Sequence, residues 1–75
     1  MPLINVKVIE GVFSSSQKQA MIKDLTEAMV RIEGENMRQV TWVFIEEVKS
    51  GNLGIGGNPL TTEAVKSLAA GIAAG

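Results

Sequence analysis

The sequence contains no cysteine and no histidine. Disulfides, thiolate nucleophiles, zinc fingers and imidazole general bases are therefore all excluded. Aromatic residues are few as well, namely Phe13, Trp42 and Phe44, so the core must be aliphatic. A chain of 75 residues makes one small domain, and a domain of that size buries only about 60% of the surface that its unfolded form exposes. Oligomerisation is the remaining route to additional stability.

The sequence also lacks an excess of charge of either sign. It has seven basic and eight acidic residues, for a formal net charge of −1, whereas a nucleic-acid-binding protein favours a basic stripe. No apolar run approaches the roughly 20 residues that span a bilayer. The opening Met-Pro-Leu-Ile-Asn has neither the basic region nor the cleavage site of a secretory signal. We expect a cytosolic protein with a single domain over residues 1–75 and no nucleic-acid or membrane partner.

Two segments in the first half of the chain carry clear patterns. Residues 3–9 are rich in β-branched side chains that alternate with Asn5 and Lys7, which predicts a strand. Ser14 followed by Gln17 is typical of the capping box that starts a helix, and Gly34 is a natural stop. These signals predict a helix of about 19 residues. Its apolar stripe consists of Met21, Leu25, Ala28, Met29 and Ile32.

The second half of the chain predicts a strand, a loop and a short helix. Residues 40–48 read as the strand, and its apolar centre from Trp42 to Ile45 indicates cover on both faces. Residues 50–59 are dense in glycine and are expected to form a flexible loop. Thr61 or Thr62 can cap the last helix. The apolar stripe of that helix consists of Ala64, Val65, Leu68, Ala69 and Ile72.

The order strand-helix-strand implies a right-handed crossover and two parallel strands. The fold class is therefore α+β: a β-α-β protomer with a glycine-rich loop and a short C-terminal helix. Two helices can cover one face of a two-stranded sheet, so the other face stays apolar and must meet another subunit. We expect an obligate homo-oligomer.

The usual catalytic patterns are missing. Glu46 and Glu47 are adjacent on a predicted strand, so their side chains point to opposite faces and cannot act as a carboxylate pair. The run from Gly54 to Gly57 lacks the lysine and the Ser/Thr of a phosphate-binding loop. The sequence has no cluster with metal-ligand spacing. We expect neither a metal nor a cofactor.

The remaining candidate for chemistry is the amino terminus. Methionine is usually removed before a small residue such as proline, and Pro2 would then present a secondary amine at the head of the first strand. An α-amino group has an ordinary pKa of about 7.7–8.0, so modest desolvation leaves it neutral at pH 7. Such an amine can act as a general base. The alternative is that Met-Pro is only a translation start followed by a stiff residue.

Several pieces taken together resemble the 4-oxalocrotonate tautomerase family. They are Pro2 at the head of a strand, the pair Glu10-Gly11 at its end, Gln17-Lys18 at the start of the helix, Glu46-Glu47-Val48 at the end of the second strand, and Gly54-Ile-Gly-Gly57. The resemblance covers residues 2–57. It implies a β-α-β protomer, usually assembled as a hexamer, whose pocket forms between subunits. It also implies that the amine of Pro2 moves a proton between the oxygen and carbon of an enol or dienol, without cofactor or metal.

Three positions depart from the family pattern. Two arginines of the typical enzyme are replaced here by Val12 and Trp42, and a loop aromatic is replaced by Leu53. In the family those arginines bind a carboxylate and polarise the carbonyl of a dicarboxylate substrate. Each lost contact is worth about 1.5–3 kcal/mol. We therefore expect weak 2-hydroxymuconate isomerisation and a changed substrate, with these three residues contacting it.

Two of the candidate residues have more than one interpretation. Trp42 either anchors a subunit interface or lines the pocket, where its indole N–H can donate one hydrogen bond. Arg38 either supplies the missing cation near the start of the second strand or is a solvated charge at a loop end. The function expected from the resemblance is a tautomerase acting on a small enol, dienol or unsaturated keto acid. The alternative is an oligomeric scaffold or small-molecule binder that kept the fold and lost the chemistry.

Overall fold

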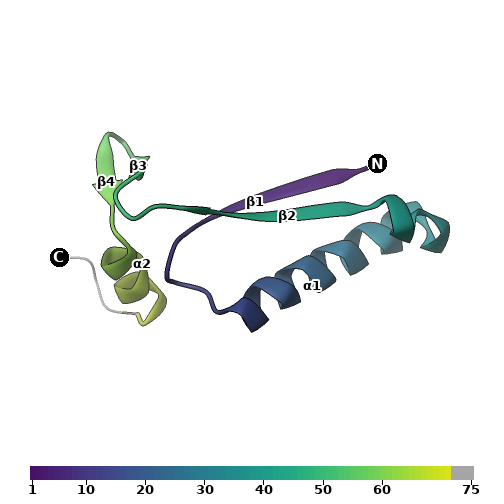
Figure 1. Ribbon diagram of the computed structural model, residues 1–75, viewed down its shortest axis with the longest axis horizontal. Coiled ribbons are helices and arrows are strands. Elements are labelled where there is room, and N and C mark those ends of the chain that lie inside the picture. The colour runs from purple at the N-terminus through teal and green to yellow at the C-terminus, as the bar shows by residue number, and fades with distance from the viewer. Residues whose placement is uncertain (72–75) are drawn as a thin grey trace. The chain divides into compact units, whose positions relative to one another are not determined.

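A computed structural model describes residues 1–71 of the chain, so Ile72 of the predicted last helix lies outside them. Strand β1 pairs with β2 as two parallel strands, and β3 pairs antiparallel with β4 (Figure 1). The predicted α+β class with its strand-helix-strand order is confirmed. The elements in order are β1 (Leu3–Ile9), α1 (Ser15–Glu33), the 3₁₀ helix η1 (Glu35–Val40), β2 (Trp42–Val48), β3 (Leu53–Ile55), β4 (Asn58–Leu60) and α2 (Thr62–Ala69).

The described chain divides into two compact units, and the boundary between them crosses both long strands. The first unit comprises Met1–Val6 and Ser14–Glu46, and the second comprises Lys7–Phe13 and the chain from Glu47 onward. Each unit is described separately below. The single-domain organisation stays a prediction.

Helix α1 begins and ends where the sequence places it. The Ser14 hydroxyl accepts from the Gln17 amide at 3.2 Å, and the Gln17 side chain accepts from the Ser14 amide at 2.9 Å. This reciprocal pair is the predicted capping box, which satisfies donors that the first helical turn leaves unpaired. Gly34 ends the helix with φ +104°, a conformation that favours glycine, and its amide donates to the Val30 carbonyl at 2.8 Å.

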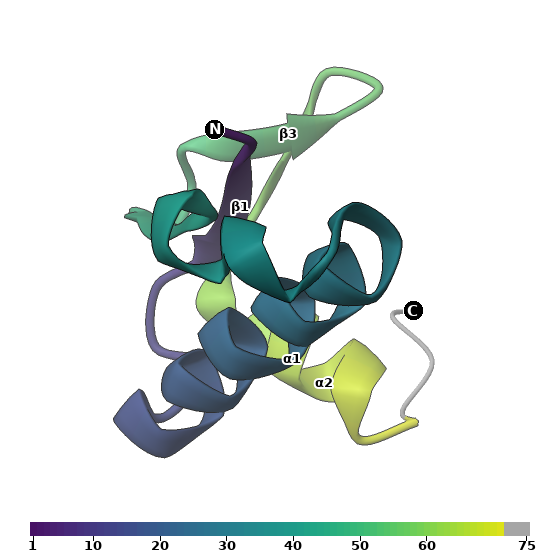
Figure 2. The same cartoon turned by 90° about the vertical axis from the view of Figure 1, so that its right-hand side faces the viewer.

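In the first unit, α1 runs along one face of the two paired strands (Figures 1 and 2). Ile4, Val6, Val43 and Ile45 are half-buried on that side. The opposite face exposes Leu3 at 48%, Trp42 at 51% and Phe44 at 43%, and the Trp42 and Phe44 ring centroids lie 6.1 Å apart. Helix α1 thus covers one face and leaves an apolar face open, as predicted. We call Leu3, Trp42 and Phe44 the open sheet face.

The structure corrects the predicted start of the second strand. Val40 ends η1 and β2 begins at Trp42, two residues later than predicted. Val40 and Thr41 are β-branched and favour a strand by composition. In the structure, however, the Thr41 hydroxyl lies beside the Met37 carbonyl, 2.8 Å away, and beside the Glu33 carboxylate. These local contacts hold the segment in a helical turn.

The predicted apolar stripe of α1 is wrong at one position. Ile32 is 82% exposed, whereas Val30, which the pattern left out, is 8% exposed and belongs to the core. The two residues lie about 200° apart around a helix of 3.6 residues per turn. The side of α1 that carries Val30 is therefore the covered side, and Ile32 remains in solvent.

The second unit holds the end of the long strands, a hairpin and α2. The predicted flexible loop is wrong in part, because β3 and β4 form a hairpin in which Leu53 pairs with Leu60 and Ile55 with Asn58. Gly56 and Gly57 make the turn with φ values of +58° and +85°, which side chains other than glycine rarely adopt. Of the two predicted caps, Thr61 is the N-cap of α2, since its hydroxyl accepts from the Ala64 amide at 3.1 Å.

Candidate active site

Pro2 lies directly before β1 and is held by β2. Its carbonyl accepts from the Trp42 amide at 3.0 Å, and the residue is half-buried. The Met1 ammonium donates to the Val40 carbonyl at 2.7 Å. While Met1 is attached, the Pro2 nitrogen is an amide without basicity. Removal of Met1 exposes an amine whose residue is still tied to β2 through its carbonyl.

Trp42 is the one proposed substrate contact that the structure joins directly to Pro2. The joining atoms belong to the backbone, so the indole is left to make other contacts. The ring lies on the open sheet face beside Phe44, with an angle of 59° between the two ring planes. This position fits both interpretations of Trp42, as an interface anchor and as a pocket wall.

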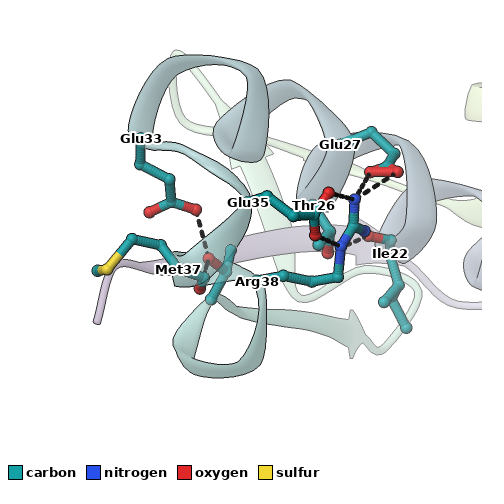
Figure 3. Close-up of polar contacts among 8 residues, drawn as sticks. Ile22, Thr26, Glu27, Glu33, Glu35, Met37 and Arg38 are labelled. Atoms are coloured by element: carbon teal, nitrogen blue, oxygen red, sulfur yellow. Dashed lines mark hydrogen bonds and ion pairs between the residues drawn. The ribbon is translucent and has the colours of Figure 1, made fainter.

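Arg38 is exposed and has two acidic partners. Its guanidinium lies between two carboxylates, with Nη2 2.8 Å from Glu27 Oε2 and Nε 2.5 Å from Glu35 Oε2 (Figure 3). The hydrogen bonds to Glu35 and then to Glu27 raise the pKa of Arg38 above its ordinary value. A substrate carboxylate would have to share the guanidinium with these partners or displace one of them. The Glu35 pairing has the i,i+3 spacing that a sequence can show, but Glu27 lies eleven residues away.

A titration tests this pairing. The hydrogen bond from Arg38 lowers the pKa of Glu35 below its ordinary 4.5. The contribution of the pair to folding is therefore present above that ordinary value and is lost as the pH falls through the lowered one. In Arg38→Gln we expect the Glu35 midpoint, followed by carbon-13 NMR of the carboxyl, to move upward. Arg31→Gln removes a charge from α1, outside the Arg38–Glu35 pair, and should leave the midpoint in place. Equal midpoints in wild type and Arg38→Gln would contradict the pairing.

The other two candidate residues belong to the second unit. Val12 is half-buried and follows Gly11, which has φ +79°. Leu53 begins β3 and is 38% exposed. Pro2, Trp42 and Arg38 belong to the first unit. Both Val12 and Leu53 present only aliphatic surface, so neither can replace the charge-assisted contacts of an arginine.

Sequence reasoning missed the Val40 carbonyl, which receives the amino terminus. No sequence signal marks it, because a backbone acceptor is available at every residue.

Among residues 1–71, no group of three histidine, cysteine, aspartate or glutamate side chains is arranged to hold a metal ion. Within the same range, no helix combines the length and apolar character that crossing a membrane requires.

Comparison with known proteins places this geometry in a family. The model of the tautomerase family, described as tautomerase enzyme, matches residues 2–63. A probable tautomerase of Helicobacter pylori (strain J99) is 36% identical over 62 residues, which cover 80% of this chain and 90% of that protein. A probable tautomerase of Staphylococcus aureus (strain Mu50) is 39% identical over 57 residues, 76% of this chain and 90% of its own.

Solved structures agree in fold. The crystal structure of apo unFused 4-OT superposes with a TM-score of 0.70 at 32% identity, over 85% of this chain and 98% of that one. A 4-oxalocrotonate tautomerase isozyme from Methylibium petroleiphilum gives a TM-score of 0.65 at 32% identity, over 85% and 97% of the two chains. The match to the family model spans the strands, α1 and the hairpin, and it includes Pro2. This chain belongs to the tautomerase family.

Proposed function

We propose that the protein is a cofactor-independent tautomerase in which the amine of Pro2, freed by removal of Met1, is the base. The observation that carries the proposal is the position of Pro2, which is half-buried at the head of β1 and bonded through its carbonyl to the Trp42 amide. Membership of the tautomerase family supports the reaction class. A residue held in this way can present its nitrogen in a fixed direction.

The proposed reaction needs only one group that accepts and then returns a proton. The neutral amine takes the proton of the enol O–H, and the oxygen forms a carbonyl as the carbon–carbon double bond moves. The resulting ammonium then delivers the proton to the distant carbon, which forms the new C–H bond and regenerates the amine. Desolvation disfavours the charged amine, so a dry pocket keeps the base neutral at pH 7.

The proposed substrate is a small enol, dienol or unsaturated keto acid with one carboxylate. The resemblance implies Val12, Trp42 and Leu53 as substrate contacts. Their side chains offer apolar surface and a single indole N–H, which suits a monoacid such as phenylenolpyruvate better than the dicarboxylate 2-hydroxymuconate. Arg38 is the proposed partner of the one carboxylate. If the substrate carboxylate displaces one of the two acidic partners of Arg38, we expect it to be Glu35, because Glu35 is more exposed than Glu27.

We further propose that the protein acts as a cytosolic homo-oligomer, namely a hexamer. The open sheet face supports association, since it exposes two aromatic side chains and a leucine. The sparse core supports it as well: Ile9 and Val30 are the buried hydrophobic residues in the described part of the chain. A neighbouring subunit would cover this face and exclude water from Pro2.

A second function, that of a non-catalytic oligomeric scaffold or small-molecule binder, is favoured by Val12, Trp42 and Leu53. The resemblance implies that typical members of the family carry arginines and an aromatic side chain at these positions. The scaffold gains support if Pro2→Ala changes no measurable activity while Trp42→Ala breaks the oligomer. The tautomerase function gains support if Pro2→Ala lowers activity while the oligomer stays intact.

The amino terminus decides whether the proposed base exists. We expect intact mass spectrometry of the native protein to give a chain lacking one methionine, because proline is a small second residue. A preparation that retains Met1 should be inactive towards phenylenolpyruvate, since its Pro2 nitrogen is an amide. Mixing the two forms should give turnover in proportion to the processed fraction. A native protein that keeps Met1 throughout, or an active Met1 form, would contradict the proposal.

A further inference from the structure

Three segments of the second unit meet at Thr62, which is buried. Its hydroxyl donates to the Glu10 carbonyl at 2.6 Å, and its amide donates to the Ser50 hydroxyl at 2.9 Å. Glu10 and Ser50 are also joined directly, because the Ser50 amide donates to the Glu10 carboxylate at 3.0 Å. Glu10, Ser50 and Thr62 thus form a closed ring of hydrogen bonds, which we call the Thr62 junction. It joins the end of β1, the segment after β2 and the start of α2.

The contact at the junction also fixes the residue that follows Glu10. Gly11 has φ +79°, and a β-carbon added there would lie 3.1 Å from the Thr62 methyl carbon. The methyl group therefore packs against a bare α-carbon in a conformation that side chains rarely adopt. Hydrogen bonding and packing at Thr62 both act on the Glu10-Gly11 pair.

Both proposed substrate contacts of this unit are attached to the junction. Val12 follows Gly11 directly. Leu53 begins β3 three residues after Ser50, and the segment between them is held by the Gly51 amide on the Leu60 carbonyl at 2.8 Å and by the Asn52 amide on the Lys49 carbonyl at 2.9 Å. Thr62 is therefore connected through hydrogen bonds and short chain segments both to the Val12 turn and to the β3–β4 hairpin.

The junction ties a segment outside the family match to residues inside it. The matched region ends at residue 63, whereas α2 continues to Ala69. Most of α2 thus lies beyond the matched residues. Its first residue, Thr62, makes the bond that links it to the Glu10-Gly11 pair.

From these contacts we infer that Thr62 is a positioning residue, which holds Val12 and the Leu53 hairpin in place for substrate binding. The inference rests on the proposed function for its kinetic consequence. Thr62 touches no reacting atom in this scheme, and it acts through the two residues that it holds. Its loss should therefore weaken binding of the substrate more than the proton transfer at Pro2.

The test is Thr62→Val in the full-length protein. Valine keeps the size and branching of threonine but removes the hydroxyl, so the Glu10 carbonyl loses its donor. We expect KM for phenylenolpyruvate to rise about tenfold while kcat changes by less than about twofold. Amide hydrogen exchange at Ser50 and Gly51 should accelerate, while exchange in α1 stays as in wild type.

Two controls separate positioning from general stability. Thr62→Ser keeps the hydroxyl and should restore KM to within about twofold of wild type. Thr61→Val removes the N-cap of α2, and so weakens the helix at the neighbouring residue, yet it should leave KM unchanged. An unchanged KM in Thr62→Val, or an equal rise in Thr61→Val, would overturn the inference.

Two further measurements cover the cases in which Thr62→Val does not fold or the proposed function fails. If Thr62→Val does not fold, Ser50→Ala removes only the acceptor of the Thr62 amide and should raise KM in the same direction, and an unchanged KM there would overturn the inference. If Pro2→Ala retains full turnover, the proposed function fails. Amide hydrogen exchange alone then tests whether Thr62 holds these segments in place. Faster exchange at the Ser50 and Gly51 amides in Thr62→Val supports this role, and unchanged exchange overturns it.

Discussion

Pro2→Ala should lower turnover of phenylenolpyruvate by about 10²–10⁴-fold, the range that a positioned general base contributes. Alanine permits removal of Met1 but lacks the ring that fixes φ, so its primary amine is no longer held in one direction. Since the Trp42 amide bonds to the carbonyl of residue 2 and not to its side chain, the strand pairing should persist. Initial rates with processed wild type and variant, each verified by mass, measure the effect.

The chain supplies a matched control for this substitution. Its other proline, Pro59, lies in β4 opposite Gly54. Pro59→Ala makes the same chemical change in the hairpin and should keep kcat within about twofold of wild type. If both alanine variants lose activity equally, the loss reflects stability, and Pro2 is not the base.

Phe44→Glu should dissociate the oligomer. Phe44 belongs to the open sheet face and is 43% exposed in the single chain. If another subunit covers that face, the introduced carboxylate is buried without a partner, which costs several kcal/mol per ion. Sedimentation equilibrium should show wild type at a multiple of the chain mass and the variant near 8.0 kDa. The dissociated Phe44→Glu variant should also lose turnover, because the proposed pocket needs the neighbouring subunit.

Ile32→Glu is the matched comparison for Phe44→Glu. It makes an equivalent apolar-to-acidic change on α1, where the side chain is already 82% exposed. We expect its mass and turnover to equal those of wild type. A Phe44→Glu protein that sediments like wild type would exclude the open sheet face as the interface.

The parts of the fold that depend on local signals could be predicted from the sequence. The capping box at Ser14 and the stop at Gly34 act over a few residues, and α1 has the predicted ends. Strand β1 has its predicted bounds as well. Local signals were misleading at Val40, where composition favours a strand but contacts with residues earlier in the chain hold a 3₁₀ turn.

Packing between elements could not be predicted in the same way. The choice between Val30 and Ile32 for the core depends on which side of α1 packs against the rest of the chain, and the sequence pattern predicted that side incorrectly at Ile32. Likewise, eleven residues separate Arg38 from Glu27, and 52 separate Thr62 from Glu10. Pro2 became a candidate because the usual catalytic patterns are missing, and the resemblance to the tautomerase family favoured it. Val12, Trp42 and Leu53 became candidates through that resemblance alone, and the roles of all four residues stay predictions.

The hydrogen bond from the Met1 ammonium to the Val40 carbonyl bears on when the protein matures. An aminopeptidase must draw the first residues into its own cleft as an extended, unattached segment. In the folded chain, the terminal ammonium and the Pro2 carbonyl are each engaged by residues 40–42. Removal of Met1 therefore requires the same terminal atoms that form hydrogen bonds when the chain folds. We therefore expect an aminopeptidase to remove Met1 more slowly from the folded protein than from a peptide with the same first residues.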